Sequence, residues 1–339
     1  MIFFQVVLGG ITRLTGSGLS ITKWDIVTGA IPPTSQKAWE EEYRLYQQTP
    51  QFAKVNKDMN LASFKRIYFW EFVHRLWARS MGFVFIFPLI YFLRKRWISA
   101  RLKKDLLGVF LLAALVASFG WIMVASGLIE RPWVNAYKLM VHLGLGIFLF
   151  EFLFVTYLKV SGITRKVGAQ PFGKGSQYIP WLLRIVAFQI LLGGLMSGMK
   201  AGFAFPTFPK LNGEWFPSVL LDASNWTIAN MKAYDVSVFA PALIQVLHRM
   251  TAYAIVFLGG LFVYKVSQES CNGLCKRTVG AFVLLVSIQI FLGVYTVLGC
   301  KYGAVPLTLG VLHQAVGLLT LSSVVLLWFL NKKGRRAKY

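Results

Sequence analysis

The sequence predicts an all-α integral membrane protein, in which eight transmembrane helices form two repeated four-helix bundles. Three observations support this fold class: the composition, the length and number of the apolar runs, and an internal repeat. Of the 339 residues, 56% are hydrophobic and only 14% are charged, and the mean hydropathy is +0.58. Because a soluble domain is nearer a quarter charged, the composition alone predicts a chain that lies in a lipid bilayer.

The apolar runs define the expected helices. Crossing the hydrocarbon core takes about 20 consecutive apolar residues. The runs cover residues 2–17, 68–93, 106–128, 138–158, 180–199, 240–264, 278–299 and 307–330. The first run is short, since only a brief apolar stretch precedes Arg13, and this leaves the true N-terminus open.

The basic residues indicate the orientation of the helices. They concentrate in the connections after the even-numbered runs and in the tail: Arg94, Lys95, Arg96, Arg101, Lys103, Lys104, Arg165, Lys166, Lys174, Lys265, Lys276, Arg277, Lys332, Lys333, Arg335, Arg336 and Lys338. The positive-inside rule then places both termini and these connections in the cytoplasm, and the long loops 18–67 and 200–239 outside. We expect a short amphipathic helix at about 36–48.

The formal net charge of +23 raises the question of a nucleic-acid partner. We reject that partner, because the basic residues lie in short runs between apolar segments and form no continuous basic face. The chain shows neither a cleavable secretory signal nor an Arg-rich and Ser-rich transit peptide. This pattern favours the inner membrane of a bacterium over an organelle.

An internal repeat relates residues 1–165 to residues 166–339. Four motifs recur in the same order, at offsets of 184, 174, 173 and 171 residues: Leu8-Gly9-Gly10 with Leu192-Gly193-Gly194, His74-Arg75 with His248-Arg249, Gly120-Trp121 with Gly293-Val294, and His142 with His313. Both halves are expected to start in the cytoplasm. The repeat therefore predicts a pseudo-two-fold axis along the membrane normal.

The chain has four histidines, and each falls on a repeated position. His74, His142, His248 and His313 lie in the second, fourth, sixth and eighth runs, each within the first two expected turns, roughly 5–13 Å below the outer surface. A single intramembrane histidine usually makes a hydrogen bond between helices. Four at repeated positions favour two pairs of axial ligands to haem iron. A zinc site is disfavoured, because zinc sites usually add cysteine or carboxylate ligands close to the histidines. Glu71 is the one such neighbour at ligand spacing.

The residues around the histidines show one difference between the halves. Three residues before His74 stands Glu71, whereas Gln245 stands three residues before His248. Residues three apart share a helix face, so Glu71 is expected in the pocket of His74. There it could transfer protons or stabilise positive charge on a bound reactant. A simple ion pair with Arg75 remains the alternative.

Arg75 and Arg249 directly follow their histidines. Two interpretations stay open for these arginines, namely binding of haem propionates and contact with lipid headgroups. Glycines near the proposed pockets would allow close helix packing or leave room for a porphyrin. They are Gly82, Gly144, Gly146, Gly310 and Gly317.

Two further features receive no role in the site. Glu151 lies over two turns beyond His142, and we interpret it as a structural partner of the basic inner connections. Cys271, Cys275 and Cys300 have no framework spacing. Cys271 and Cys275 are interpreted as free thiols on the inner side.

Taken together, the motifs resemble those of the haem A synthases over nearly the whole chain, most closely the mitochondrial and related bacterial branch. The resemblance rests on these segments: Gly9 to Thr15, Ser17 to Ser20, Trp24, Pro32 to Thr34, Trp39, Glu71 to Arg75, Gly120-Trp121, Ser126 to Leu128, His142, Ala201-Gly202, Thr207 to Lys210, His248-Arg249 and His313-Gln314. Two positions depart from the family. This chain has no cysteine pair in its first outer loop, so a redox role for such a pair does not apply here, and Pro206 replaces a polar residue of several relatives.

The resemblance implies an oxidoreductase that converts the C8 methyl group of haem O to a formyl group, with water as the final oxygen source. His74 and His142 would hold the substrate haem, His248 and His313 would ligate a resident haem b, and Glu71 would be the essential acid. Implied partners are the lipid bilayer, haem O, the haem O synthase and terminal oxidase assembly factors. The sequence leaves a homo-oligomer open.

Two alternatives to the enzyme remain at this point. The first is a non-enzymatic di-haem b-type electron-transfer protein, which would also use four histidines on helices. The second is a haem transporter or chaperone without redox chemistry. A protein that transfers electrons across the membrane would place its two haems at different depths. The four histidines of this chain are expected at one depth.

Overall fold

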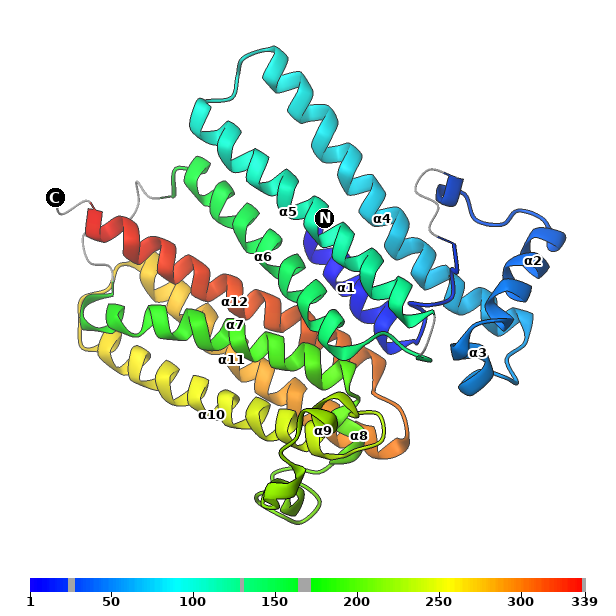
Figure 1. The fold of residues 1–339 in the computed structure, drawn as a ribbon. Coiled ribbons are helices and arrows are strands. Elements are labelled where there is room, and N and C mark those ends of the chain that lie inside the picture. Colours follow the sequence, from blue (N-terminus) through cyan, green and yellow to red (C-terminus); the bar gives the residue numbers. More distant parts are fainter. Residues whose placement is uncertain (24–27, 129–130, 164–171, 337–339) are drawn as a thin grey trace. The chain divides into compact units, whose positions relative to one another are not determined.

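The computed structural model describes residues 1–23, 28–128, 131–163 and 172–336. Within these ranges the chain is helical, has no β-strand, and contains one isolated bridge between Leu211 and Glu214. Seven helices are long and apolar enough to cross a membrane. They are α4 (Leu61–Arg94), α5 (Ala100–Gly127), α6 (Ala136–Val160), α7 (Ile179–Gly198), α10 (Phe239–Ser267), α11 (Gly273–Gly299) and α12 (Leu307–Arg336). The all-α, multi-pass class is therefore confirmed (Figure 1).

The first apolar run forms α1 (Ile2–Leu14), a helix of 13 residues that is shorter than a membrane span. The remaining helices of the described residues are short. They are η1 (Thr28–Ala30), α2 (Gln36–Gln47), α3 (Pro50–Lys54), η3 (Gly173–Gln177), α8 (Ala201–Ala204), η4 (Ser218–Leu220), η5 (Ala223–Asn225), α9 (Ile228–Lys232) and η6 (Cys300–Tyr302). Trp24, Arg165, Lys166, Lys338 and the expected domain boundary after 165 lie outside the described residues.

Polar side chains mark the starts of several long helices, as expected for N-caps. The side chains of Asn60, Ser99, Asn135 and Asn272 accept hydrogen bonds from backbone N–H groups in the first turns of α4, α5, α6 and α11. The cap at Asn60 starts α4 at Leu61, seven residues before the expected start at 68.

An aromatic cluster explains the early start of α4. The rings of Tyr46, Phe64 and Tyr68 are buried together and join α2 to the first turns of α4. This packing extends α4 beyond its apolar stretch, which hydropathy alone does not detect. The cluster also contains most of the aromatic face of α2, so the amphipathic helix expected at 36–48 is confirmed.

The helix bounds correct the expected positions of two histidines. His142 and His313 each follow the first residue of their helix by six positions, within the first two turns. His248 follows Phe239 by nine positions and His74 follows Leu61 by 13. The prediction that every histidine lies within the first two turns is therefore right for α6 and α12 and wrong for α4 and α10.

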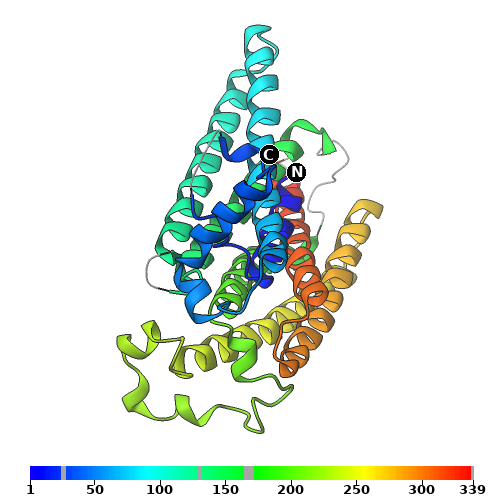
Figure 2. The ribbon, with the colours of Figure 1, turned by 90° about the vertical axis from the view of Figure 1, so that its right-hand side faces the viewer.

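The chain divides into two compact units, Met1–Leu149 and Phe150–Tyr339, with the boundary inside α6. In the first unit, α1 packs against α4. The helices α4 and α5 run side by side in both ribbon views and are joined at one end by a short turn after Arg94 (Figures 1 and 2).

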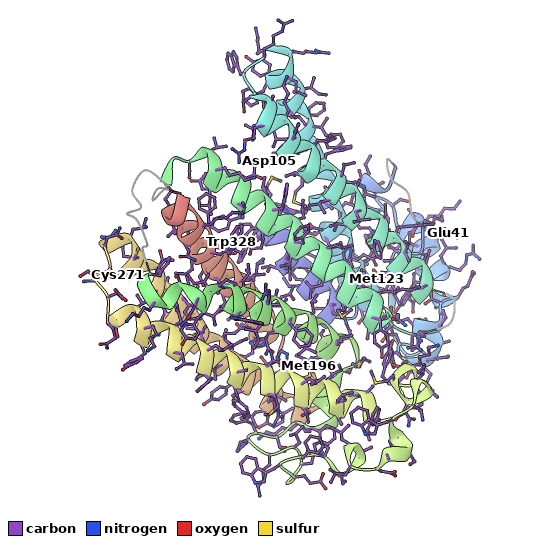
Figure 3. All side chains as sticks on the ribbon, turned by 60° about the vertical axis from the view of Figure 1, so that its left-hand side comes forward. Glu41, Asp105, Met123, Met196, Cys271 and Trp328 are labelled. Carbon is purple, nitrogen blue, oxygen red and sulfur yellow. The ribbon has the colours of Figure 1, made fainter. Side chains whose placement is uncertain are left out.

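In the second unit, α7 packs against both α10 and α12, and α11 packs against α12. The segment that joins α7 to α10 folds over the start of α10, where Phe205, Leu211 and Phe239 share a buried cluster. Figure 3 shows Cys271 at the turn between α10 and α11, while Met196 lies on α7.

The long helices carry apolar side chains on their outer surfaces. Phe83 and Phe87 on α4 are 60% and 65% exposed, and Leu107 and Leu111 on α5 are 57% and 58% exposed. Such surfaces are unfavourable in water and suit hydrocarbon. Their position on the span-length helices supports burial of these helices in a bilayer.

Candidate functional site

The two histidines of the second half face each other. His248 on α10 and His313 on α12 have ring centres 6.4 Å apart, with the ring planes at 68°. Both Nδ1 atoms are buried, and neither has a hydrogen-bond partner among the described residues. A pair of partly buried imidazoles, each with a buried Nδ1 atom that has no hydrogen-bond partner among the described residues, is therefore built into this unit.

The spacing of this pair fits a single metal ion between the rings. A metal–imidazole nitrogen bond is about 2.0–2.1 Å long, and a ring nitrogen lies about 1.1 Å from the ring centre, so two opposed ligands place their ring centres about 6.3 Å apart. The observed 6.4 Å matches this value. In their chemistry and in their ring-centre distance, His248 and His313 would suit a shared haem iron, which they would hold through their imidazole nitrogens.

A glutamine contacts each of these imidazoles from a neighbouring helix. The Nε2 atom of Gln189 on α7 lies 3.2 Å from Nε2 of His248, and Nε2 of Gln289 on α11 lies 3.4 Å from Nε2 of His313. An amide nitrogen can only donate, so each contacted imidazole nitrogen presents its lone pair. These contacts are also the interhelical hydrogen bonds expected of a histidine without a cofactor.

A glycine lies beneath each imidazole of the second half. A Cβ atom on Gly293 would stand 2.9 Å from Cε1 of His313, and one on Gly193 would stand 3.6 Å from Cε1 of His248. The first distance is well below an ordinary carbon–carbon contact of about 3.5–4.0 Å. The absence of a side chain at Gly293 therefore makes room for the His313 ring.

The first half repeats this arrangement with the same residue types. A Cβ atom on Gly120 of α5 would stand 2.9 Å from Cε1 of His142, and one on Gly9 of α1 would stand 3.3 Å from Nε2 of His74. His74 and His142 lie in the same unit and interact electrostatically. The structure therefore brings His248 and His313 face to face, and it keeps His74 and His142 within one unit.

The polar contacts of the first pair resemble those of the second at only one histidine. Gln5 Nε2 lies 3.0 Å from His74 Nε2, as Gln189 does for His248. His142 instead has its Nδ1 3.1 Å from the carbonyl oxygen of Val116. Because a carbonyl oxygen only accepts, Nδ1 of His142 carries the proton and its Nε2 is left as the acceptor, as a metal ligand requires.

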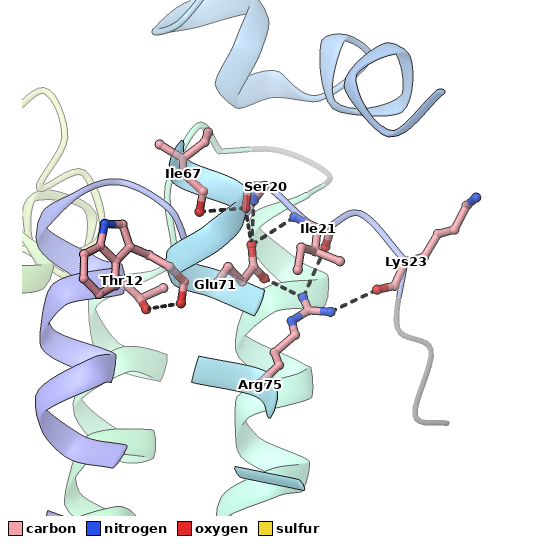
Figure 4. A network of polar contacts seen from close by, with 8 residues as sticks. Thr12, Ser20, Ile21, Lys23, Ile67, Glu71 and Arg75 are labelled. Carbon is pink, nitrogen blue, oxygen red and sulfur yellow. Dashed lines mark hydrogen bonds and ion pairs between the residues drawn. The ribbon is translucent and has the colours of Figure 1, made fainter. Parts of the chain in front are cut away.

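Glu71 is buried, with 2% of its surface exposed. Its Oε2 atom accepts hydrogen bonds from the N–H and the hydroxyl of Ser20, at 2.8 and 2.7 Å, and from the N–H of Ile21 at 2.9 Å. Its Oε1 atom lies 2.6 Å from Nη2 of Arg75 (Figure 4). Every partner donates, which is the pattern that an ionised carboxylate accepts.

Both arginines after the histidines bind backbone carbonyls of the long loops. Arg75 donates to Ile21 O and Lys23 O at 3.1 and 3.0 Å. Arg249 donates to the carbonyl oxygens of Thr207, at 2.6 Å, and of Pro209, at 2.9 Å. The ion pair expected as an alternative for Glu71 is present, and both guanidinium groups also anchor a loop.

The remaining candidate residues lie apart from the histidine pairs. Glu151 is 7% exposed, and its Oε1 accepts a hydrogen bond from the Ser322 hydroxyl at 2.7 Å. Its observed partner is thus a residue of α12 instead of a basic connection. Cys271 and Cys275 are free thiols.

Sequence reasoning missed the glutamines, although they leave a signal. Gln5, Gln189 and Gln289 each begin the pattern Gln-x-x-Leu-Gly, whose glycine is the one beneath the imidazole. A polar residue four positions before a repeated glycine in an apolar run is sufficient to identify them. Val116 stands at the corresponding place before Gly120.

These features define a multi-pass α-helical membrane protein with two pairs of partly buried histidines, one per unit, of which the second has a ring spacing that suits one metal ion. The model of the COX15-CtaA family, described as cytochrome oxidase assembly protein, matches residues 1–325. The chain belongs to this family.

Curated relatives extend the match over almost the full length. A protein of Nitrosospira multiformis named heme A synthase is 36% identical over 99% of this chain and 91% of its own length. The heme A synthase of Caulobacter vibrioides is 40% identical over 93% of this chain and 88% of its own. That of Chelativorans sp. is 36% identical over 96% and 87%.

Proposed function

We propose that this chain is a haem A synthase, an oxidoreductase that converts the C8 methyl group of haem O to a formyl group and so provides haem A for a terminal oxidase. The observation that carries the proposal is its similarity to curated heme A synthases over 93–99% of the chain. The two pairs of partly buried histidines supply the ligands that a haem substrate and a haem cofactor need.

The halves are assigned different haems. His74 and His142 hold the substrate haem, and His248 and His313 ligate a resident haem b. The ring spacing of 6.4 Å in the second pair supports the cofactor assignment. When bound, haem b supplies one-electron redox chemistry, tuned by its axial ligands and their hydrogen bonds.

Glu71 is the catalytic residue of the reactive half. Oxidation of a methyl group with water (R–CH3 + H2O giving R–CHO + 4 H+ + 4 e−) passes four electrons to an oxidant and releases four protons. Positive charge develops on the substrate when electrons leave before the protons do. A buried carboxylate one turn before His74 can stabilise that charge or accept a proton. Its four donors favour stabilisation of charge by an ionised carboxylate.

Arg249 is assigned to a propionate of haem b. Its guanidinium donates to backbone carbonyl oxygens through Nη1 and Nη2, and an arginine has five N–H donors in all. Donors therefore remain for an anionic group. Arg75 is assigned the equivalent role in the first half because it directly follows His74, as Arg249 follows His248.

The finer topology is part of the same proposal. We assign eight transmembrane helices in two four-helix halves related by a pseudo-two-fold axis along the membrane normal, in a bacterial inner membrane with both termini in the cytoplasm. The recurrence of glutamine and glycine around His74 and His248 supports the repeat. Haem O synthase and terminal oxidase assembly factors are the proposed partners.

Expression of this chain together with a haem O synthase, in membranes that contain no other haem A synthase, tests the function. Haem extracted from the membranes is separated and identified by mass. The proposal predicts haem A, which is absent when the chain is omitted. Haem O without haem A, in a protein that retains both bound haems, would support the electron-transfer alternative instead.

A further inference from the structure

The carboxylate of Glu71 is bound by a short segment that follows α1. The Ser20 hydroxyl, the Ser20 N–H and the Ile21 N–H all donate to the same oxygen, Oε2, at 2.7, 2.8 and 2.9 Å. Ser20 is 51 residues away in sequence from Glu71. Figure 4 shows these donors converging on the carboxylate from one side and Arg75 approaching from another.

The contact is closed to water. Ser20 is fully buried at 0% exposure and Glu71 is 2% exposed. The hydroxyl of Ser20 also lies 3.4 Å from the Ile67 carbonyl, but its distance to Glu71 is much shorter. A hydroxyl has one proton, so the Ser20 hydroxyl donates mainly to the carboxylate. Hydrogen bonds to a charged group are the stronger class, particularly where water is excluded.

The second half also anchors a loop, but there the side chain donates the hydrogen bond instead of accepting it. Gln245, which stands where Glu71 stands relative to its histidine, donates from Nε2 to the Phe205 carbonyl at 3.0 Å. Gln245 is also fully buried. A side chain three residues before the histidine thus holds a loop in both halves. In the first half it accepts from N–H and O–H groups, and in the second half it donates to a carbonyl.

We propose that Ser20 is a positioning residue for Glu71, and that the Ser20-Ile21 segment is part of the reactive half. The segment fixes the carboxylate one turn from His74 and satisfies Oε2, which leaves Oε1 with Arg75 on the other side. This inference rests on the proposed function of Glu71. It also means that loss of activity in Glu71→Gln does not by itself separate charge stabilisation from loop anchoring.

Ser20→Ala separates the two roles because it removes one donor and keeps the carboxylate. In the purified protein we expect kcat for haem O conversion to fall about ten- to a hundredfold, with KM changed less than about threefold. The haem b spectrum should be unchanged. Ser20→Thr, which keeps the hydroxyl, should restore most of kcat.

Ser17→Ala is the matched control. Ser17 is equally buried in the same segment, but its hydroxyl contacts Thr15 at 2.7 Å and not Glu71. Its kcat should stay within about twofold of the wild type. Equal losses in Ser17→Ala and Ser20→Ala, or no loss in Ser20→Ala, would overturn the positioning role.

A second measurement does not depend on activity. Hydrogen exchange at the Ile21 amide should accelerate in Glu71→Ala, because this N–H donates to Glu71. The Ser20 N–H also donates to the Ser17 carbonyl oxygen at 3.0 Å, a bond that the variant keeps, so the Ile21 amide is the one that reports on the anchor. Gln245→Ala should leave exchange at the Ile21 amide unchanged. Unchanged exchange in Glu71→Ala would refute the anchor itself. If the wild-type protein makes no haem A, the proposed function fails and the catalytic part of this inference fails with it, while the exchange result still decides the anchor.

Discussion

Replacing Gly293 with alanine is expected to remove haem b from the protein while leaving the helices folded. A Cβ atom at this position would stand 2.9 Å from Cε1 of His313. Because carbon atoms in contact are about 3.5–4.0 Å apart, the imidazole must move by about 0.6 Å or more. Metal–ligand distances tolerate only about 0.2 Å, so this shift is about three times too large for ligation.

The same shift of the His313 imidazole should change the unfolding free energy only slightly. The imidazole is the end of a side chain, so it can rotate away without moving the backbone of α12. We expect the unfolding free energy of the haem-free protein to change by less than about 1 kcal/mol. Loss of haem without loss of fold is therefore the specific signature of this variant.

Gly280→Ala is the matched control, because it lies on the same helix and its added Cβ would meet no atom within 4 Å. Both variants are purified in detergent, and the haem-to-protein ratio is measured together with the reduced-minus-oxidised visible spectrum. Gly293→Ala should lose the low-spin haem b signal that Gly280→Ala retains. Equal haem content and equal spectra in the two variants would refute the assigned geometry.

Three further predictions concern other residues. Glu71→Gln should keep the haem b spectrum and lower haem O conversion about a hundredfold or more; normal conversion in a kinetic assay would remove Glu71 from the reaction. His248→Ala should lose the haem b spectrum, and a retained bis-imidazole signal would place the cofactor elsewhere. Gln189→Leu removes an amide that competes with iron for the His248 lone pair, so haem titration should show about fivefold tighter binding; weaker binding would mean that the amide contacts the haem.

The sequence predicted the seven long helices and placed His248 and His313 in one site, whereas the eighth expected span is a helix of only 13 residues. Long apolar runs and a repeat of His-Arg pairs are local signals, and they survive in any arrangement of the helices. The early start of α4 was missed because its extension depends on Tyr46, which belongs to another helix. Hydropathy does not report such a contact.

The glycines show a similar limit. Sequence reasoning singled out Gly82 and Gly146 as allowing close helix packing or leaving room for a porphyrin. A Cβ atom on either would meet nothing within 4 Å, which argues against close packing at these two positions and leaves room for a porphyrin as a prediction. The glycines that touch imidazoles are those of the repeated motifs, including Gly120 and Gly293. The repeat was therefore a better guide to the site than nearness to a histidine along one helix.

Ser20 could not have been assigned from the sequence. Its partner Glu71 lies on another segment, and the contact depends on the turn that follows α1. The comparison of Glu71 with Gln245 predicted a difference between the halves, and the structure adds that both residues anchor a loop. Long-range polar contacts of this kind need three-dimensional coordinates.

Haem extraction from three purified proteins tests the central claim, that the two halves hold different haems. Wild-type protein, His74→Ala and His248→Ala are each isolated from membranes that contain a haem O synthase, and their haems are identified by mass. We predict haem b with haem O or haem A in the wild type, haem b alone in His74→Ala, and loss of haem b in His248→Ala. The same haem composition in both variants would contradict the division of labour between the halves.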